Sequence, residues 1–250
     1  MNLYNTNQYP LITLVTSSYN PLGKKFPKEK NYQPGVLLMG TYKVYCISSM
    51  QILYNLIIEL TKFQVLILGV PKNSSIEGTI ASKRYKQYEN QLTRTKEDII
   101  WNPLGISFLL IDIDFGDVMG FELNTAKEVL DFLITLDPEL ARCGILILPS
   151  SSQKFDPSNK SWHCYIEVCN ATDETVILYS KTLQSICWNK KLGNIKLSKS
   201  GSMLVRQVFD IAVFSPERLI VESCFSDDHS VIFNEIEPLI QEGEARALYE

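Results

Sequence analysis

The sequence lacks the patterns that mark secreted, membrane-spanning and disulfide-bonded proteins. The first eight residues have neither a basic start nor an apolar core, so we expect no signal peptide. No apolar run approaches the roughly 20 residues that span a bilayer. The 6 cysteines include no C-x-x-C pair, and several fall in predicted strands or helices, where free cysteine behaves as a small hydrophobic residue. We therefore expect a reduced, cytoplasmic protein without structural zinc.

The chain also lacks a strong excess of charge of either sign. Its formal net charge of −4 gives no overall nucleic-acid signature, although a local basic surface is compatible with an acidic total. There are no internal repeats and no low-complexity tracts. With 250 residues, 45% of them hydrophobic and 21% charged, the composition predicts one large domain or two small ones with a sizeable core.

Two aspartates stand at the end of an apolar run at residues 107–114. The run is rich in branched and aromatic side chains, which predicts a buried strand. Asp112 and Asp114 would then project from one face, roughly 7 Å apart. Carboxylates at the end of a buried strand are costly to desolvate, and a divalent cation with oxygen ligands is the usual remedy. The alternative is that both acids cap the turn at residues 115–120.

The segments around this run predict alternating strands and helices. Polar and apolar spacing predicts helices at 48–60, at 124–136 with Asn124 as N-cap, and at 172–188. Strands are expected among residues 9–47 and at 65–70, 144–149 and 161–168, with a long polar loop at 150–160 and a basic hairpin at 193–202. This order predicts a mixed α+β or α/β fold.

Several polar side chains are candidates for phosphate contact. Ser161 and His163 share one face of a predicted strand after a serine-rich loop, a setting that suits phosphate, although a lone histidine is more often structural. Arg94 lies between two threonines. One interpretation is that it contacts a phosphate or a template backbone, and the other is that it belongs to a solvated helix. Lys196 and Lys199 lie in the basic hairpin. The basic loop that begins at residue 23 is a phosphate contact or a solvated turn.

A third acid, Asp210, again follows an apolar run, and Arg218 lies eight residues later. The order Asp-x-Asp, Ser-x-His and apolar-Asp followed by Val-Phe-Ser-x-x-Arg resembles the archaeo-eukaryotic primase superfamily, which has the primase–polymerase fold. The segments Leu-Thr-Arg-Thr-Lys at 92–96 and Lys-Ser-Gly-Ser at 199–202 look like the primase domains of bacterial phages, plasmids and integrated mobile elements. The resemblance covers residues 65–245, with a weaker match in the N-terminal strands.

The resemblance implies a primase–polymerase catalytic core, with an RRM-like mixed or antiparallel sheet flanked by helices, at 71–250. An N-terminal α/β module at 1–70 would pack on it as part of one compact unit. It implies a primer-synthesising nucleotidyltransferase of a mobile element in a bacterial cytoplasm, acting on a single-stranded DNA template with nucleoside triphosphates. The implied ligands of two Mg²⁺ or Mn²⁺ ions, which are also the catalytic residues, are Asp112, Asp114 and Asp210. The implied nucleotide contacts are Ser161, His163 and Arg218, and the implied template or phosphate contacts are Arg94, Lys196 and Lys199.

The chain departs from the family pattern at Trp162, where relatives have glycine before the histidine, after an insertion-like loop at 153–160. It has no Gly-x-x-x-x-Gly-Lys-[Ser/Thr] phosphate loop, so a helicase would be a separate chain or a missing domain. Two other functions remain open. A DNA-binding replication-initiation module without catalysis would not need paired acids. A metal-dependent nuclease would not need Ser161 and His163 together with Arg218.

Overall fold

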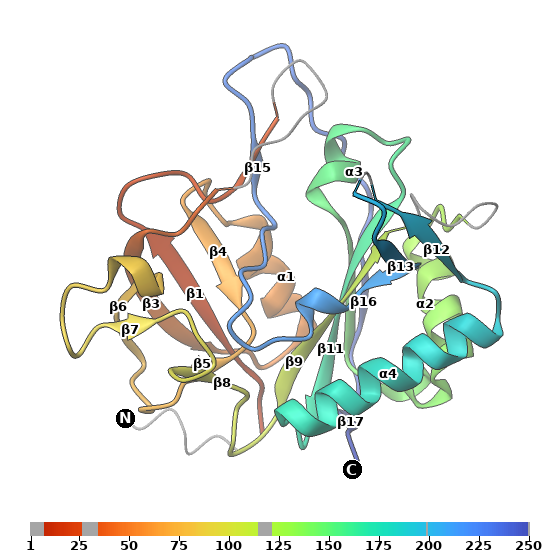
Figure 1. The fold of residues 1–250 in the computed structure, drawn as a ribbon, viewed down its shortest axis with the longest axis horizontal. Coiled ribbons are helices and arrows are strands. Elements are labelled where there is room, and N and C mark those ends of the chain that lie inside the picture. The colour runs from red at the N-terminus through yellow and green to blue at the C-terminus, as the bar shows by residue number, and fades with distance from the viewer. Residues whose placement is uncertain (1–7, 27–34, 115–121, 199, 250) are drawn as a thin grey trace.

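The computed structural model describes residues 8–26, 35–114, 122–198 and 200–249, which form a mixed α+β fold (Figure 1). One large mixed sheet has helices on both faces, so the predicted α+β class is confirmed. The strands are β1 (Leu11–Ser17), β2 (Lys24–Lys25), β3 (Met39–Cys46), β4 (Gln64–Ile67), β5 (Val70–Pro71), β6 (Glu77–Ala81), β7 (Leu92–Thr93), β8 (Ile99–Ile100), β9 (Ser107–Asp114), β10 (Ile145–Pro149), β11 (Ser161–Cys169), β12 (Gly193–Leu197), β13 (Met203–Gln207), β14 (Phe209–Asp210), β15 (Cys224–Phe225), β16 (Leu239–Gln241) and β17 (Arg246–Ala247). The helices are α1 (Met50–Ile58), α2 (Ala126–Leu136), α3 (Ser151–Phe155) and α4 (Asp173–Asn189), with 3-10 turns η2 (Lys83–Tyr85), η3 (Pro138–Arg142) and η4 (Ile211–Val213).

The large sheet contains strands from both ends of the chain. Its order is β16-β10-β11-β9-β1-β3-β6-β7, while β4, β14 and β17 pair with β1, β9 and β11. Strands β1, β3 and β4 come from the predicted N-terminal module, and the other strands of the sheet come from the predicted catalytic region. The sheet therefore continues across the expected boundary at residue 70.

One edge of β9 pairs with two different strands along its length, and this arrangement makes room for a site. β11 runs antiparallel along the whole of β9. On the other edge, β1 pairs in parallel at Leu11 and Ser107, near the start of β9. Near the end of β9 the same edge is taken by the short strand β14, which pairs at Asp112. The carboxyl end of β9 is thus enclosed by two strands that come from distant parts of the sequence.

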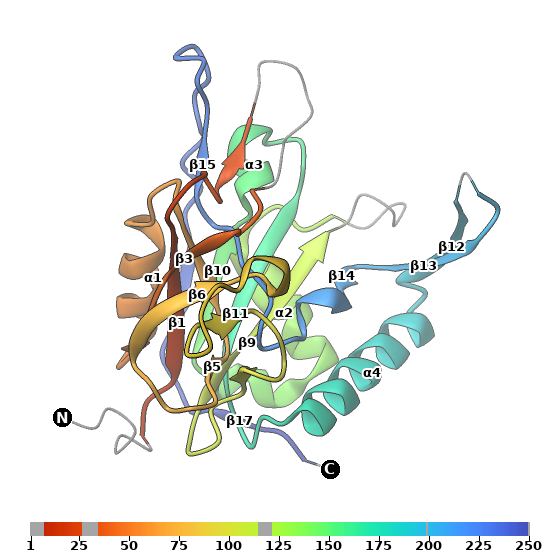
Figure 2. The same cartoon turned by 60° about the vertical axis from the view of Figure 1, so that its left-hand side comes forward.

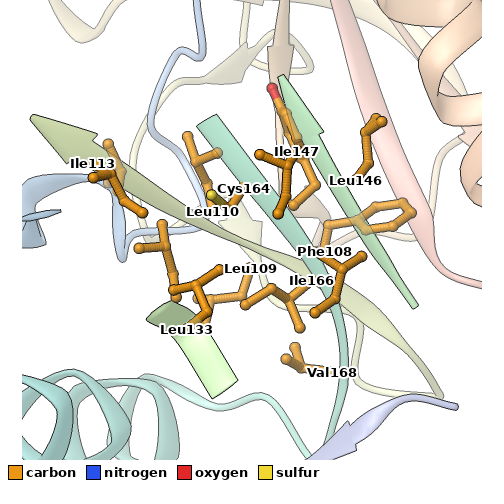
Figure 3. Close-up of a cluster of buried hydrophobic side chains, with 14 of the residues drawn as sticks. Phe108, Leu109, Leu110, Ile113, Leu133, Leu146, Ile147, Cys164, Ile166 and Val168 are labelled. Atoms are coloured by element: carbon orange, nitrogen blue, oxygen red, sulfur yellow. The ribbon is translucent and has the colours of Figure 1, made fainter. Parts of the chain in front are cut away.

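Helices cover the two faces of this part of the sheet. α2 packs on one face, where its side chain Leu133 lies beside Leu109 of β9 in the core cluster (Figure 3). α1 lies on the opposite face. The Met50 side chain, at the start of α1, lies near Gly144, on the side where Gly144 faces Glu167. The Met50 amide also donates to Glu242. Among the described residues, no helix has both the length and the apolarity to cross a membrane.

The helix predictions needed three corrections. The segment around Arg94 contains β7 followed by a turn, and not a solvated helix. α2 begins after Thr125 and not after Asn124, because the Thr125 hydroxyl and the Glu128 carboxylate bond each other's backbone amides in a capping box. The predicted polar loop at 150–160 contains α3, capped by Ser150. This one-turn helix has no local periodicity to reveal it, and Phe155 packs it by stacking on Phe26 with ring centroids 4.5 Å apart.

A buried acid beneath α1 gives a testable dependence of stability on pH. Burial, and then the charge of Glu242, raises the pKa of Glu167 to about 7. An acid whose pKa is higher in the folded state binds more protons there, so it lowers stability as pH rises from its unfolded value toward 7. We expect Glu167→Gln to raise Tm at about pH 8 more than at about pH 5. The difference should be about 2–4 °C, or about 1 kcal/mol, after allowing for solvent screening at this site.

Differential scanning fluorimetry at the two pH values measures this effect. Glu237→Gln is the matched control, because Glu237 is exposed on the surface. An equal change in Tm at both pH values in Glu167→Gln would contradict the assignment.

Candidate active site

The β14–β9–β11 ladder gathers the predicted acids and the Ser-x-His pair on one face. Asp112 stands opposite Asp210 on one side and opposite His163 on the other. Asp114 stands opposite Ser161. Directly paired residues point to the same face of a sheet, so five side chains from three sequence segments converge. The geometric expectation for these five residues is met, while their chemical roles stay predictions.

These side chains line a pocket of about 660 Å³, which we call the carboxylate pocket. Its lining comes from the acids of β9 and β14, and from β11 with the segment that leads into it. The hairpin β12–β13 and α4 supply further lining residues. The lining residues are Lys24, Asp112, Asp114, Ser150, Ser152, Asn159, Ser161, His163, Gln184, Val205, Gln207, Phe209 and Asp210.

The surroundings of Asp112 in the pocket disfavour its ionisation. Burial raises the pKa of Asp112, and the charges of Asp210 and Asp114 add to that effect. His163 and Lys24 act in the opposite direction. A pocket lined by three carboxylates on one face favours the binding of positive charge.

His163 is held by a buried carboxylate that sequence reasoning did not identify. Its Nδ1 lies 2.6 Å from Oε1 of Glu222, and the hydroxyl of Tyr165 donates to the same oxygen at 2.5 Å. The exposed fraction of the Glu222 side chain is 0%. Burial would raise the pKa of Glu222, but the charge and hydrogen bond of His163 outweigh it and lower the pKa to about 2. Because an ionised carboxylate only accepts hydrogen bonds, Nδ1 of His163 carries the proton.

This contact directs the other ring nitrogen of His163 toward the acids. Nε2 lies 3.6 Å from Oδ1 of Asp112. Burial would lower the pKa of His163, but Glu222 and Asp112 together raise it. Nε2 therefore faces the carboxylate pocket, and protonation of the ring, which these two acids favour, would let it donate to an anionic ligand there.

Glu222 reaches this position because its segment joins the two halves of the sheet. Ile220 and Leu66 of β4 exchange backbone hydrogen bonds of 2.8 and 3.1 Å. Two residues later, Glu222 contacts His163 and Tyr165 of β11. The segment after Asp210 thus spans from β4 to β11 over the site.

A second hollow, about 370 Å³ in volume, adjoins the first and contains three cations. We call it the basic pocket, defined by Lys24, Arg94 and Arg218. Asp112, His163 and Asp210 line both pockets. Burial lowers the pKa of Arg94, with the charge of Glu217 opposing and that of Arg218 adding to the shift.

Arg94 has a donor available for an anion. Its Nη1 donates to the carbonyl of Glu217 at 3.5 Å. Its Nε is buried and has no hydrogen-bond partner in the part of the chain that the structure describes. A phosphate oxygen in the basic pocket would satisfy such a donor.

Two predicted contacts are not in either pocket as described. Lys196 is exposed on β12, outside the lining of both hollows. Lys199 lies outside the described residues. Lys24, in the basic loop whose role the sequence left open, lines both pockets.

A glutamate after three apolar residues at 219–221 was the one available signal for Glu222.

The donor set of the carboxylate pocket suits hard divalent cations, because Asp112, Asp114 and Asp210 offer oxygen ligands on one face. Within the described residues, no group of three or more His, Cys, Asp or Glu side chains is close enough to form a complete metal site. The cation ligands therefore stay a prediction from residue type and shared face.

Comparison with known proteins adds no relative to this description. No protein-family model matches the chain, and no curated protein and no solved structure matches it.

Proposed function

We propose that this chain is a template-directed nucleotidyltransferase that synthesises primers, a DNA primase or primase–polymerase of a replicating mobile element. One observation supports this most strongly. Asp210, Asp112 and His163 form a single row across β14, β9 and β11, although about a hundred residues of sequence separate the first acid from the last. The finer fold within this proposal is a primase–polymerase core with an RRM-like sheet and an N-terminal α/β module.

In this proposal, each of the two pockets serves a different part of the reaction. The reaction joins a 3′-oxygen to the α-phosphorus of a nucleoside triphosphate and releases pyrophosphate. Arg94, Arg218 and Lys24 would bind the triphosphate oxygens in the basic pocket, where cations neutralise developing charge. His163 would donate from Nε2 to the same phosphates, held in orientation by Glu222.

The acids would serve as the cation ligands. Asp112, Asp114 and Asp210 would hold Mg²⁺ or Mn²⁺ at the junction of the two pockets. When bound, two such ions stabilise the attacking and leaving oxygens of an in-line displacement. The carboxylates also place negative charge where the 3′ end of the strand and the triphosphate must meet. Without bound cations, the site would therefore repel both.

Two other functions explain fewer of these contacts. A DNA-binding module without catalysis needs no crowded acids beside a pocket. A metal-dependent nuclease needs the acids, but not three cationic side chains in the adjoining pocket. The proposed partners are single-stranded DNA, nucleoside triphosphates and a helicase that is a separate chain or a missing domain.

Nucleotide binding tests the proposal directly. A nucleoside triphosphate with Mn²⁺, at about a hundredfold excess over its dissociation constant, should stabilise the fold by about 2.7 kcal/mol. That corresponds to about 5–10 °C in Tm, which thermal shift measures. Chelator should cancel the shift, and Arg218→Ala should weaken it because a triphosphate contact is lost.

Arg142→Ala is the control for Arg218→Ala, since Arg142 makes exposed ion pairs and lines neither pocket. A shift of equal size without a divalent ion would contradict the role of the acids. An unchanged nucleotide affinity in Arg218→Ala would contradict the role of the basic pocket.

A further inference from the structure

The hairpin β12–β13 stands out from the body of the protein beside α4 (Figure 2). Its register pairs Ile195 with Val205 and Leu197 with Met203, so these four side chains share one face. Their exposed fractions are 59%, 61%, 69% and 74%, in the order Ile195, Val205, Leu197 and Met203. A two-stranded ribbon that exposes four large apolar side chains on one face is a candidate binding surface.

This apolar face continues into the carboxylate pocket. Val205 belongs to the face, and Gln207 lies two residues along the same strand and on the same side. Both residues line the carboxylate pocket together with Asp112, Asp114 and Asp210. A ligand that extends from the pocket along the hairpin would therefore lie on apolar side chains.

The surrounding sequence is cationic and free of acids. Residues 175–209 contain no Asp or Glu, in a chain whose net charge is −4. Lys190 and Lys191 are exposed where α4 leads into the hairpin, and Lys196 is exposed on β12, on the face opposite Ile195 and Leu197. The basic residues of the segment are Lys181, Lys190, Lys191, Lys196, Lys199 and Arg206. The segment thus offers an apolar face within a positive field, which complements a polyanion with flat apolar parts.

We propose that the apolar face of the β12–β13 hairpin holds the bases of a single-stranded DNA template whose path continues to the carboxylate pocket. This inference rests on the proposed function and adds the surface that binds the strand. A single strand combines unpaired bases, which pack on apolar side chains, with phosphates, which bind lysine. A purely apolar protein partner would not match the basic residues of this segment. An acidic partner would not match the apolar face of the hairpin.

The test removes the outer apolar pair without touching the pocket. The variant is Leu197→Ser with Met203→Ser, and the matched control is Ile177→Ser with Leu178→Ser on α4. The control side chains are exposed by 43% and 44% and lie in the same acid-free segment. Fluorescence polarisation with a labelled single-stranded oligothymidylate gives affinity and its dependence on salt. Nucleotide-dependent thermal shift and light scattering are measured on the same preparations.

The hairpin variant should bind the oligonucleotide about tenfold more weakly, because less apolar area is buried on binding, while the α4 control keeps wild-type affinity. The salt slope should stay the same in the hairpin variant, because no cation is removed, and should fall in Lys190→Gln, which removes an exposed cation where α4 leads into the hairpin. The nucleotide-dependent shift in Tm should be unchanged. This last measurement reports the proposed function separately, since its absence in the wild type would reject catalysis whatever the hairpin does.

Three results would overturn the inference. They are wild-type oligonucleotide affinity in the hairpin variant, an equal loss in the α4 control, or a wild-type dimer that the hairpin substitutions dissociate. The last result would assign the apolar face to a second copy of the chain.

Discussion

Replacing Asp112 or Asp210 with asparagine should reduce nucleotide incorporation at least about a thousandfold and leave the fold intact. Each carboxylate is proposed to hold divalent cations, whose stabilisation of transition-state charge amounts to several kcal/mol. Asp210→Asn keeps a side-chain oxygen at the position that accepts from the amide of Ala212 in the wild type at 2.8 Å. Burial and the neighbouring acids raise the pKa of Asp112, so its neutral replacement should hold or raise Tm without ligand.

Labelled nucleotide incorporation on a single-stranded template measures the loss, and melting temperature reports the fold. Asp131→Asn is the matched control, because Asp131 pairs with Lys127 on the exposed side of α2. Near-normal incorporation in Asp112→Asn would reject the cation-ligand assignment.

Replacing Glu222 with alanine should cost about 3–5 kcal/mol of stability, or about 10 °C in Tm. The substitution leaves the His163 ring N–H and the Tyr165 hydroxyl buried without their shared acceptor. Nucleotide KM should also rise, because His163 would lose the contact that orients Nε2. Glu222→Gln, which keeps an acceptor oxygen, should recover part of the stability.

The contribution of this pair has a defined pH range. Glu222, with its pKa lowered to about 2 from 4.5, adds stability above pH 4.5 that is lost as pH falls through 2. His163, with its pKa raised from 6.5, adds stability below 6.5 that is lost as pH rises through its folded value. Tyr165→Phe is the control, since it removes one bond to Glu222 and keeps the contact with His163. A rise in nucleotide KM in Tyr165→Phe equal to that in Glu222→Ala would reject the orienting role of Glu222.

The sequence predicted the parts of the site that strand periodicity determines. An apolar run with acids at i and i+2 places Asp112 and Asp114 on one face whatever the rest of the fold. The same alternation placed Ser161 and His163 together on their strand. Local sequence cannot give the register between strands, and it is register that sets Asp210 and His163 on either side of Asp112.

The contacts that sequence reasoning missed depend on long-range packing. Glu222 became a partner of His163 because Ile220 pairs with Leu66, and no local pattern shows that pairing. Lys24 lies in a basic loop that the sequence leaves open between a phosphate contact and a solvated turn. It joins both pockets because β2 pairs with β15, about two hundred residues later. α3 was missed for a similar reason, since its one turn depends on tertiary packing rather than propensity.

The most direct measurement of the central proposal is primer synthesis on homopolymeric single-stranded DNA templates with one labelled nucleotide at a time. The proposal predicts that labelled chains form with the nucleotide complementary to the template, require Mg²⁺ or Mn²⁺, and are lost in Asp210→Asn. Incorporation independent of template sequence, or shortening of the template without incorporation, would contradict template-directed nucleotidyl transfer at the carboxylate pocket.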